Sequence, residues 1–323
     1  MNTQQKTTED FYMSLFGDLN TTDNWPAKQP LLAHYTSFAT LERILATDEV
    51  WFSNPLFMND LEELRFGIFE GIQQFFTNVK VKDACRTKER FELLANAFNH
   101  YSNVFNNEHA LDVYVFCTVE HDESNPDGQL SMWRGYGGNG NGAAIVIDTK
   151  QFGVQPDSPL VVSRVEYLST EERRQWISKK LEQFANLLTN LNPPDDQLFI
   201  PASFIFERIK LFALFTKHRG FIEEREWRIV FLKDRDKKKL LEPMFDYAIG
   251  PRGMEPKLKF KVQPIEGLTT DDLSLSKIIK QIILGPMMSS PLAKSTVLRM
   301  LEKLKKPELR DRVTSSTIPF RVV

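Results

Sequence analysis

Charged residues of both signs directly precede an apolar run late in this chain. The stretch Glu223-Glu224-Arg225-Glu226-Trp227-Arg228 holds three carboxylates and two guanidiniums, and Ile229-Val230-Phe231-Leu232 follows at once. The apolar run predicts a buried strand. Charged groups at the start of such a strand are costly to desolvate unless they form ion pairs or take part in a functional site. The stretch therefore indicates either a functional site or a structural ion-pair ladder.

Size and composition are those of an ordinary globular protein. The chain has 323 residues, 41% of them hydrophobic and 26% charged, which excludes fibrous and disordered classes. A net charge of −2 gives no global attraction to nucleic acid or to acidic membranes. The basic triplet Lys237–Lys239 is interpreted as a solvated hairpin tip, with a phosphate contact as the alternative.

Cysteine usage and hydropathy predict the compartment. Cys85 and Cys117 show no Cys-x-x-Cys spacing, so neither a structural zinc nor a disulfide framework is indicated. No signal-type N-terminus is present, and no apolar run reaches ~18 residues. We therefore expect a cytoplasmic protein with no membrane partner and no metal cofactor.

The periodicity of apolar residues predicts an α+β fold. We expect an N-terminal extension over residues 1–30, then a single α+β domain over 31–323 with helical insertions at about 60–107 and 169–218. The domain should hold a central, mostly antiparallel split sheet. Strands are predicted at 50–53, 113–119, 143–148, 161–167, 227–233, 245–249, 257–262, 280–284 and 317–322. Helices are predicted at 38–45, 60–75, 87–106, 170–190, 202–218 and 290–305, with a single turn at 131–136.

A glycine-rich loop, Gly135 to Gly142, could approach a ligand closely, because glycine tolerates positive φ. It lacks the order of a phosphate loop and precedes a strand, so mononucleotide and dinucleotide folds are not supported. No Gly-x-Ser-x-Gly elbow occurs, and the histidines lack metal-type spacing. Classical hydrolases and metalloenzymes are therefore disfavoured.

The remaining candidate residues could together grip NAD. A histidine and hydroxyls can hold a ribose or an amide, an aromatic ring can stack on a flat ring, and a glutamate can stabilise an oxocarbenium-like charge. Glu-x-Glu spacing on a strand would turn both carboxylates to one face. The candidates are His34, Tyr35 and Thr36 on a first strand, Ser53 and Asn54 at a strand end, Trp133 and Tyr136 near the glycine loop, and Glu224, Glu226 and Arg228.

Each candidate also has a structural interpretation. His34 could be a core histidine with one backbone hydrogen bond, and Glu224, Glu226 and Arg228 could form an ion-pair ladder. Trp133 and Tyr136 could serve as lid packing. The pair Asn59-Asp60 is interpreted as a turn and helix cap, with Glu63 completing a capping box.

Several dispersed motifs resemble a known family. They are His-Tyr-Thr-Ser (34–37), Phe-Ser-Asn-Pro (52–55) with Phe57, Asn59, Asp60 and Glu62, Met-Trp-x-x-Tyr (132–136), Glu-x-Glu-Trp-Arg (224–228), Ile-Leu-Gly (283–285) and Ile-Pro-Phe-Arg (318–321). In this order they resemble a widespread bacterial domain family of unknown function. The resemblance implies an association of some members with abortive-infection, antiphage loci.

A weaker resemblance, to ADP-ribosyltransferases, lies in His34-Tyr35-Thr36 and in Glu224-x-Glu226. It implies mono-ADP-ribosyl transfer or NAD hydrolysis, as a toxin or phage-defence effector, with NAD as the substrate and a protein or nucleic acid as the acceptor. His34 and Tyr35 would position NAD, Ser53 and Asn54 would line the pocket, and Tyr136 would stack on nicotinamide. In this scheme Glu226 supports the transition state, Glu224 orients or deprotonates the acceptor, and Arg228 pairs a phosphate or holds Glu226.

Two other hypotheses stay open. The same pocket could belong to a non-catalytic sensor or interaction module that binds a nucleotide, an NAD-like small molecule or a peptide and signals to a partner. A metal-dependent nuclease would need Asp60, Glu62, Glu224 and Glu226 to converge in a basic groove. The sequence gives no indication of the oligomeric state, and the transferase hypothesis assumes that His34 and Glu226 share one pocket.

Overall fold

The structure, a computed structural model, describes residues 10–20, 30–58, 61–107, 109–152, 158–250 and 253–320. The chain divides into two compact units. The helical unit comprises residues 1–23, 55–113 and 165–222, and the sheet unit comprises residues 24–54, 114–164 and 223–323. All ten candidate residues of the predicted NAD site belong to the sheet unit.

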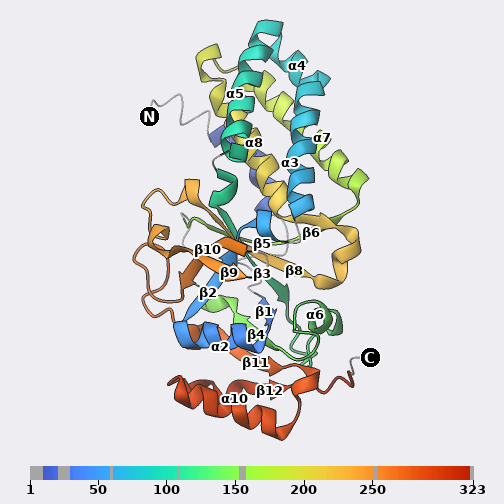
Figure 1. Cartoon of the computed structure of the whole chain (residues 1–323). Helices are drawn as coiled ribbons and strands as arrows, with labels where there is room; N and C mark the ends of the chain where they lie inside the picture. Colours follow the sequence, from blue (N-terminus) through green and yellow to red (C-terminus); the bar gives the residue numbers. More distant parts are fainter. Residues whose placement is uncertain are drawn as a thin grey trace. The chain divides into compact units, whose positions relative to one another are not determined.

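Five helices lie side by side in the helical unit (Figure 1). They are α3 (Leu61–Thr77), α4 (Val79–Cys85), α5 (Lys88–Asn107), α7 (Thr170–Leu191) and α8 (Phe199–Leu214), with the 3₁₀ segments η1 (Met13–Asn20), η2 (Pro55–Phe57), η3 (His109–Asp112) and η5 (Asp195–Gln197). A capping box between Ser169 and Glu172 starts α7. The stacked rings of Phe75 and Phe98, with centroids 3.8 Å apart, join α3 to α5.

Two short strands belong to the helical unit and correct two predictions. The helix predicted over 202–218 ends at Leu214, and Thr216–His218 forms β7, which pairs in parallel with β6 (Glu166–Leu168). The strand predicted over 161–167 is accordingly divided between β5 (Leu160–Arg164) and β6. Tertiary pairing decides these ends, because the backbone N–H of Glu166 donates to the carbonyl of Phe215.

A ten-stranded sheet dominates the sheet unit within the described residues. Its order is β12-β11-β4-β1-β3-β2-β10-β9, and β8 pairs with both β3 and β5. The bounds are β1 (Leu31–Thr36), β2 (Glu49–Ser53), β3 (Val113–Glu120), β4 (Ala143–Asp148), β8 (Glu226–Leu232), β9 (Phe245–Gly250), β10 (Gly253–Lys261), β11 (Ile279–Leu284) and β12 (Val313–Ser315).

The sheet is mostly antiparallel, and β11–β12 is a parallel pair. β1 pairs with β3 through Val119 and Glu120, whereas β2 pairs with β3 through Val115, so two groups of strands diverge from β3. The predicted α+β class with a central antiparallel sheet is confirmed.

Helices and short 3₁₀ segments connect these strands. They are α2 (Phe38–Thr47), α6 (Leu130–Gly135), η4 (Thr149–Gln151), η6 (Arg219–Glu224), η7 (Lys233–Arg235), η8 (Glu242–Met244), α9 (Leu275–Ile278), η9 (Pro286–Met288), α10 (Pro291–Lys303) and η10 (Pro307–Arg312). The Oγ of Ser37 caps α2 by accepting a hydrogen bond from the backbone N–H of Thr40.

Alternating side chains give the sheet two different faces. We call first face the one whose apolar residues form the larger core, with Phe52, Phe116, Ile145, Ile229, Phe231, Leu258 and Phe260 among its members. The opposite, second face carries a smaller cluster that includes Ala33, Tyr35, Val119, Met132, Trp133, Ala144 and Val146. Because successive residues of a strand point to opposite faces, this division assigns a face to each candidate residue on a strand.

The strand predicted at 317–322 is wrong over its described part. The last strand is β12, Val313–Ser315, and residues 316–320 have no regular structure. Thr317 instead directs its backbone N–H and its hydroxyl to the carboxylate of Asp127, and Pro319 has no N–H to give to a ladder. No helix within the described ranges is long and apolar enough to cross a membrane.

Candidate functional site

His34 and Tyr35 lie next to each other on β1 but point to opposite faces of the sheet. The His34 ring packs on Phe116 of the first face, with centroids 4.6 Å apart, and its Nδ1 lies 3.0 Å from the carbonyl oxygen of Cys117. Tyr35 packs against Trp133 on the second face. The prediction that His34 and Tyr35 grip one ligand group together is therefore wrong, because the side-chain period of a strand is two.

The environment of His34 favours its neutral form. Burial lowers the pKa of His34, and the hydrogen bond to the Cys117 carbonyl opposes that shift only in part. Because a carbonyl accepts, the proton of the neutral ring is assigned to Nδ1. These features match the core-histidine interpretation.

We expect this histidine to make stability depend on pH. The folded-state pKa of His34 lies below the ordinary value of 6.5. Its contribution to the free energy of unfolding is therefore present above pH 6.5 and is lost as the pH falls through the folded-state pKa. Below pH 6.5 the wild type should lose up to about 1.4 kcal/mol per pH unit more than a His34→Phe variant. Urea unfolding of both proteins between pH 7 and pH 5 measures this difference, and equal slopes would contradict it.

Trp133 and Tyr136 have different surroundings. Trp133 is fully buried, donates its indole N–H to the carbonyl of Asp127 at 2.9 Å and meets Tyr35 edge to face at 4.8 Å. Tyr136 is 44% exposed, and its hydroxyl lies 3.0 Å from Oε1 of Glu224. Trp133 therefore acts as packing in this structure, whereas Tyr136 is accessible.

The loops before and after α6 pack against β1. Tyr35 Oη accepts the backbone N–H of Gln129 at 2.9 Å, and burial raises the pKa of Tyr35. Gly128 has φ of 76°, and a Cβ there would lie 2.5 Å from Tyr35 Oη. A Cβ on Gly142 would lie 2.1 Å from the backbone oxygen of Thr36, itself a buried residue. The glycines at 128 and 142 thus serve close contact with β1 in this structure.

The two glutamates of the charged stretch do not share a strand. Glu224 ends η6, β8 begins at Glu226, and Arg225 between them has φ of 46° in the left-handed region. A positive φ is uncommon for a residue with a Cβ and marks a backbone held by its surroundings. The prediction that Glu-x-Glu lies on one strand and faces one side is therefore wrong.

Glu226 forms a buried ion pair with Arg228. The Nε–Oε1 distance is 2.9 Å and the Nη2–Oε2 distance is 3.1 Å, and both residues are 4% exposed. Both lie on the second face, since Ile229 and Phe231 of the same strand belong to the first-face core. Glu226 and His34 consequently occupy opposite faces, which contradicts the assumption of a shared pocket.

A second charged group lies on the second face, on β2 and β10. Lys257 Nζ is 2.9 Å from Ser53 Oγ and 2.9 Å from Glu255 Oε2. Asn54, directly after Ser53, is fully buried. Sequence reasoning missed Glu255 and Lys257 as candidate site residues. Opposite charges two residues apart on a strand were the available signal.

A polar cleft of about 440 Å³ opens where several strands of the sheet begin or end. It lies at the ends of β3 and β4 and at the starts of β1, β8 and β11. Its lining is charged with both signs, and consists of Pro30, Leu31, Glu120, His121, Asp122, Glu123, Asp148, Lys150, Arg225 and Lys280. Arg225 of the charged stretch pairs with Glu120 there, with Nη2 3.0 Å from Oε1.

Electrostatics in this cleft favour an ionised Asp122 carboxylate beside a neutral His121 imidazole. Burial lowers the pKa of His121, while nearby Asp122 and Glu123 act in the opposite direction. The hydroxyl and backbone N–H of Ser124 hold the pKa of Asp122 below its usual value. Sequence reasoning missed this cleft, although the run Glu120-His121-Asp122-Glu123 directly after a strand was visible.

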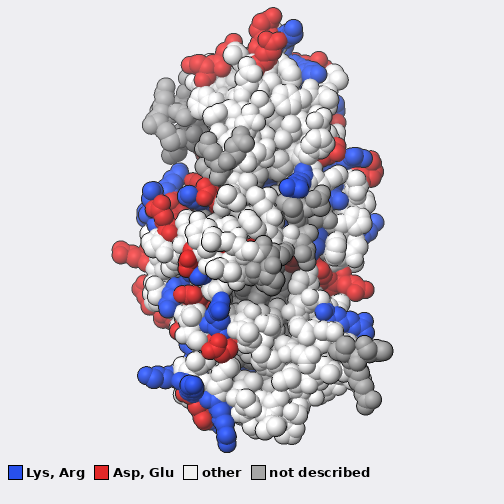
Figure 2. All heavy atoms as spheres, in the orientation of Figure 1, with Lys and Arg blue, Asp and Glu red and all other residues white. Residues whose placement is uncertain are grey.

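The metal-dependent nuclease stays a prediction. Asp60 lies outside the described residues, as does the side chain of Glu62. Within the described part of the chain, no three His, Cys, Asp or Glu side chains gather in an arrangement that could hold a metal ion. On the face drawn in Figure 2, acidic and basic side chains are interspersed.

The comparison with family models concerns the middle of the chain. Residues 132–229 match the family "Protein of unknown function (DUF2971)". The DUF2971 segment contains Trp133, Tyr136, Glu224, Glu226 and Arg228, and the predicted resemblance to a family of unknown function is confirmed there. No curated protein and no solved structure matches the chain.

Proposed function

We propose that this protein binds NAD or a related nucleotide in the polar cleft and acts as a ligand sensor or interaction module. The observation that carries the proposal is a cleft of about 440 Å³ whose charges converge from several strand ends. Small-molecule sites have volumes of about 300–1,000 Å³ and a few convergent polar groups. A phage-defence or toxin setting is part of the proposal through the motif resemblance alone.

The mixed charge of the cleft suits a ligand that carries both signs. NAD combines a negative diphosphate with a positive nicotinamide ring. Lys150 follows β4 and Lys280 lies on the adjacent strand β11, so these two ammonium groups suit the diphosphate. Asp122 and Glu123 follow β3. Because β1 lies between β3 and β4, the ends of β3 and β4 are about 10 Å apart across the sheet. Their carboxylates suit the positive ring or the ribose hydroxyls.

A second candidate function is the NAD-dependent ADP-ribosyl transfer suggested by the sequence, and one contact favours it. The Arg228 guanidinium contacts both oxygens of the Glu226 carboxylate, and Glu226 directly follows Arg225 of the cleft. An ionised carboxylate is the group that stabilises an oxocarbenium-like transition state. In this version His34 has no role in catalysis, and the acceptor is a protein or a nucleic acid.

Binding is tested with NAD and a lysine-substituted protein. The double variant Lys150→Ala/Lys280→Ala should bind NAD at least about tenfold more weakly than the wild type, because two charge-assisted contacts are lost. Lys277→Ala is the matched control, since this lysine lies outside the cleft and pairs with Asp272. Calorimetric titration measures the affinities, and equal affinities in all three proteins would overturn the assignment of the cleft.

Chemistry is tested separately with Glu226→Gln. The sensor proposal predicts no nicotinamide release from NAD, and binding nearly unchanged in Glu226→Gln. The transferase candidate predicts release and ADP-ribose attachment to lysate protein or nucleic acid, both abolished in the variant. Mass spectrometry of the same incubations distinguishes the two, and absence of NAD binding by the wild type would refute both.

A further inference from the structure

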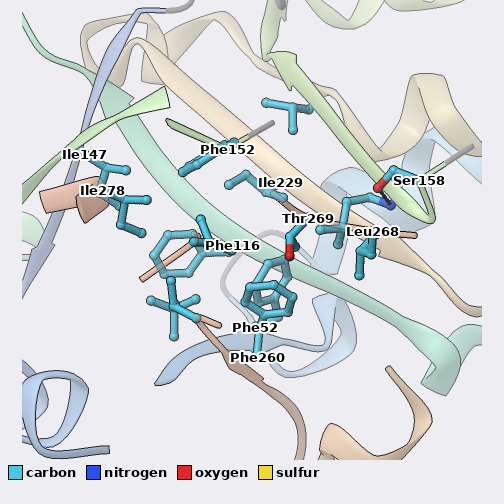
Figure 3. A pocket seen from close by; sticks show the side chains of 15 residues that line it. Phe52, Phe116, Ile147, Phe152, Ser158, Ile229, Phe260, Leu268, Thr269 and Ile278 are labelled. Carbon is cyan, nitrogen blue, oxygen red and sulfur yellow. Dashed lines mark hydrogen bonds between the residues drawn. The ribbon is translucent and has the colours of Figure 1, made fainter. Parts of the chain in front are cut away.

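The first face of the sheet contains an apolar cavity that no part of the proposed function uses. Its volume is about 60 Å³. Side chains of β2, β3, β4, β5, β8 and β10 line it together with those of the 262–273 segment and α9, as Figure 3 shows. The rings of Phe52 and Phe116, with centroids 5.5 Å apart, form part of its wall.

Among the residues that the structure describes, the lining carries no charged group. Thirteen of the fifteen lining residues are apolar, and the other two are Ser158 and Thr269. Ser158 Oγ already accepts the backbone N–H of Leu160 at 3.1 Å, and Thr269 Oγ1 accepts that of Ile265 at 2.7 Å. Both hydroxyls are thus engaged with the backbone and do not require a polar ligand group.

Water is a poor occupant of such a space. A buried water needs two to four polar partners, and cavities lined by apolar side chains stay dry and take up apolar molecules instead. A volume of about 60 Å³ is larger than the roughly 10–15 Å³ that a single water molecule needs. Native cores ordinarily close voids of this size by packing. The space therefore matches a short hydrocarbon group.

We infer that this cavity binds the short alkyl end of a small molecule. Leu160, Val162 and Thr269 are only partly buried, which places the mouth of the cavity beside these three described residues. A polar head would remain in water at this mouth while the alkyl end contacts Phe52, Phe116 and Ile229. The site is distinct from the polar cleft, since none of its residues lines that cleft.

The experiment uses 1-butanol as the probe and butane-1,4-diol as its control. The diol matches the chain length but cannot bury either end without losing a hydroxyl's hydrogen bonds. Methyl NMR of the full chain reports on Ile147, Ile229 and Ile278, which line the cavity. We expect their signals to shift saturably with 1-butanol and not with the diol, while Ile200 of α8 stays unchanged.

Two substitutions at Val162 make the result specific. Val162→Phe fills the space and should weaken 1-butanol binding at least about tenfold. Val162→Leu adds one methylene and should have an intermediate effect, which keeps the test available if the larger ring prevents folding. Unsaturable shifts in the wild type, equal shifts with the diol, or unchanged binding in a folded variant would each overturn the inference. The NAD titration does not affect this outcome.

Discussion

Replacing Arg228 by Met is expected to destabilise the protein by about 3–5 kcal/mol, because the carboxylate of Glu226 would stay buried after losing its guanidinium. Both residues are 4% exposed, so water cannot take over the lost contact at low cost. Urea unfolding followed by tryptophan fluorescence measures the change. A loss below about 1 kcal/mol would contradict the prediction.

Two control proteins separate this effect from a general loss of charge. The double variant Glu226→Leu/Arg228→Met removes both charges and should recover most of the lost stability, since apolar replacements of buried ion pairs are often neutral or stabilising. Arg174 pairs with Glu70 at 3.1 Å with half of its own side chain exposed. Arg174→Met should therefore cost less than about 1 kcal/mol.

Recovery of stability in the double variant would bear on function as well. A charged pair that can be replaced without loss is not required by the fold, so selection for ligand binding or chemistry becomes the better account of its presence. Failure to recover would instead favour the structural ion-pair ladder, the alternative interpretation of this stretch.

Trp133→Ala is expected to destabilise the protein by about 3–5 kcal/mol, because it empties a fully buried site and leaves the Asp127 carbonyl without the indole N–H. Tyr136→Ala, three residues later and 44% exposed, should cost less than about 1 kcal/mol. Thermal and urea unfolding of the two variants measure the contrast.

The same pair of variants tests the ligand-stacking role predicted for both rings. If Trp133→Ala keeps its stability and loses NAD binding, then the tryptophan acts on a ligand and the packing account is wrong. Tyr136 is the ring that remains available for stacking, because it is 44% exposed and its hydroxyl contacts Glu224. Loss of NAD affinity in Tyr136→Phe would indicate that this hydroxyl is needed as well.

Local sequence patterns were sufficient for most elements of the fold. The α+β class and the mostly antiparallel sheet followed from periodicity and from β-branched and aromatic runs. The helix at Lys88–Asn107 and the strand at Val113–Glu120 differ from the predicted bounds by a residue or so. Errors occurred where pairing partners decide the structure, as at β7 and at residues 317–320.

The candidate site was predictable only in part. The charged stretch before β8 did contain a buried ion pair, but the sequence could not show which charges pair. Alternation on β1 should have separated His34 from Tyr35 at once, because neighbouring residues of a strand face opposite sides. The partnership of Lys257 with Ser53 joins positions 204 residues apart, so it depends on the pairing of β2 with β10.

The sequence by itself determined most of the helices and strands, because side-chain period, capping residues and β-branched runs act over a few neighbouring residues. Only the tertiary structure decided that His34 and Glu226 lie on opposite faces, that Arg225 enters a charged cleft with Glu120, and that the first face encloses an apolar cavity. These features depend on strand order and register, which are set by long-range burial and hydrogen bonding across the whole sheet.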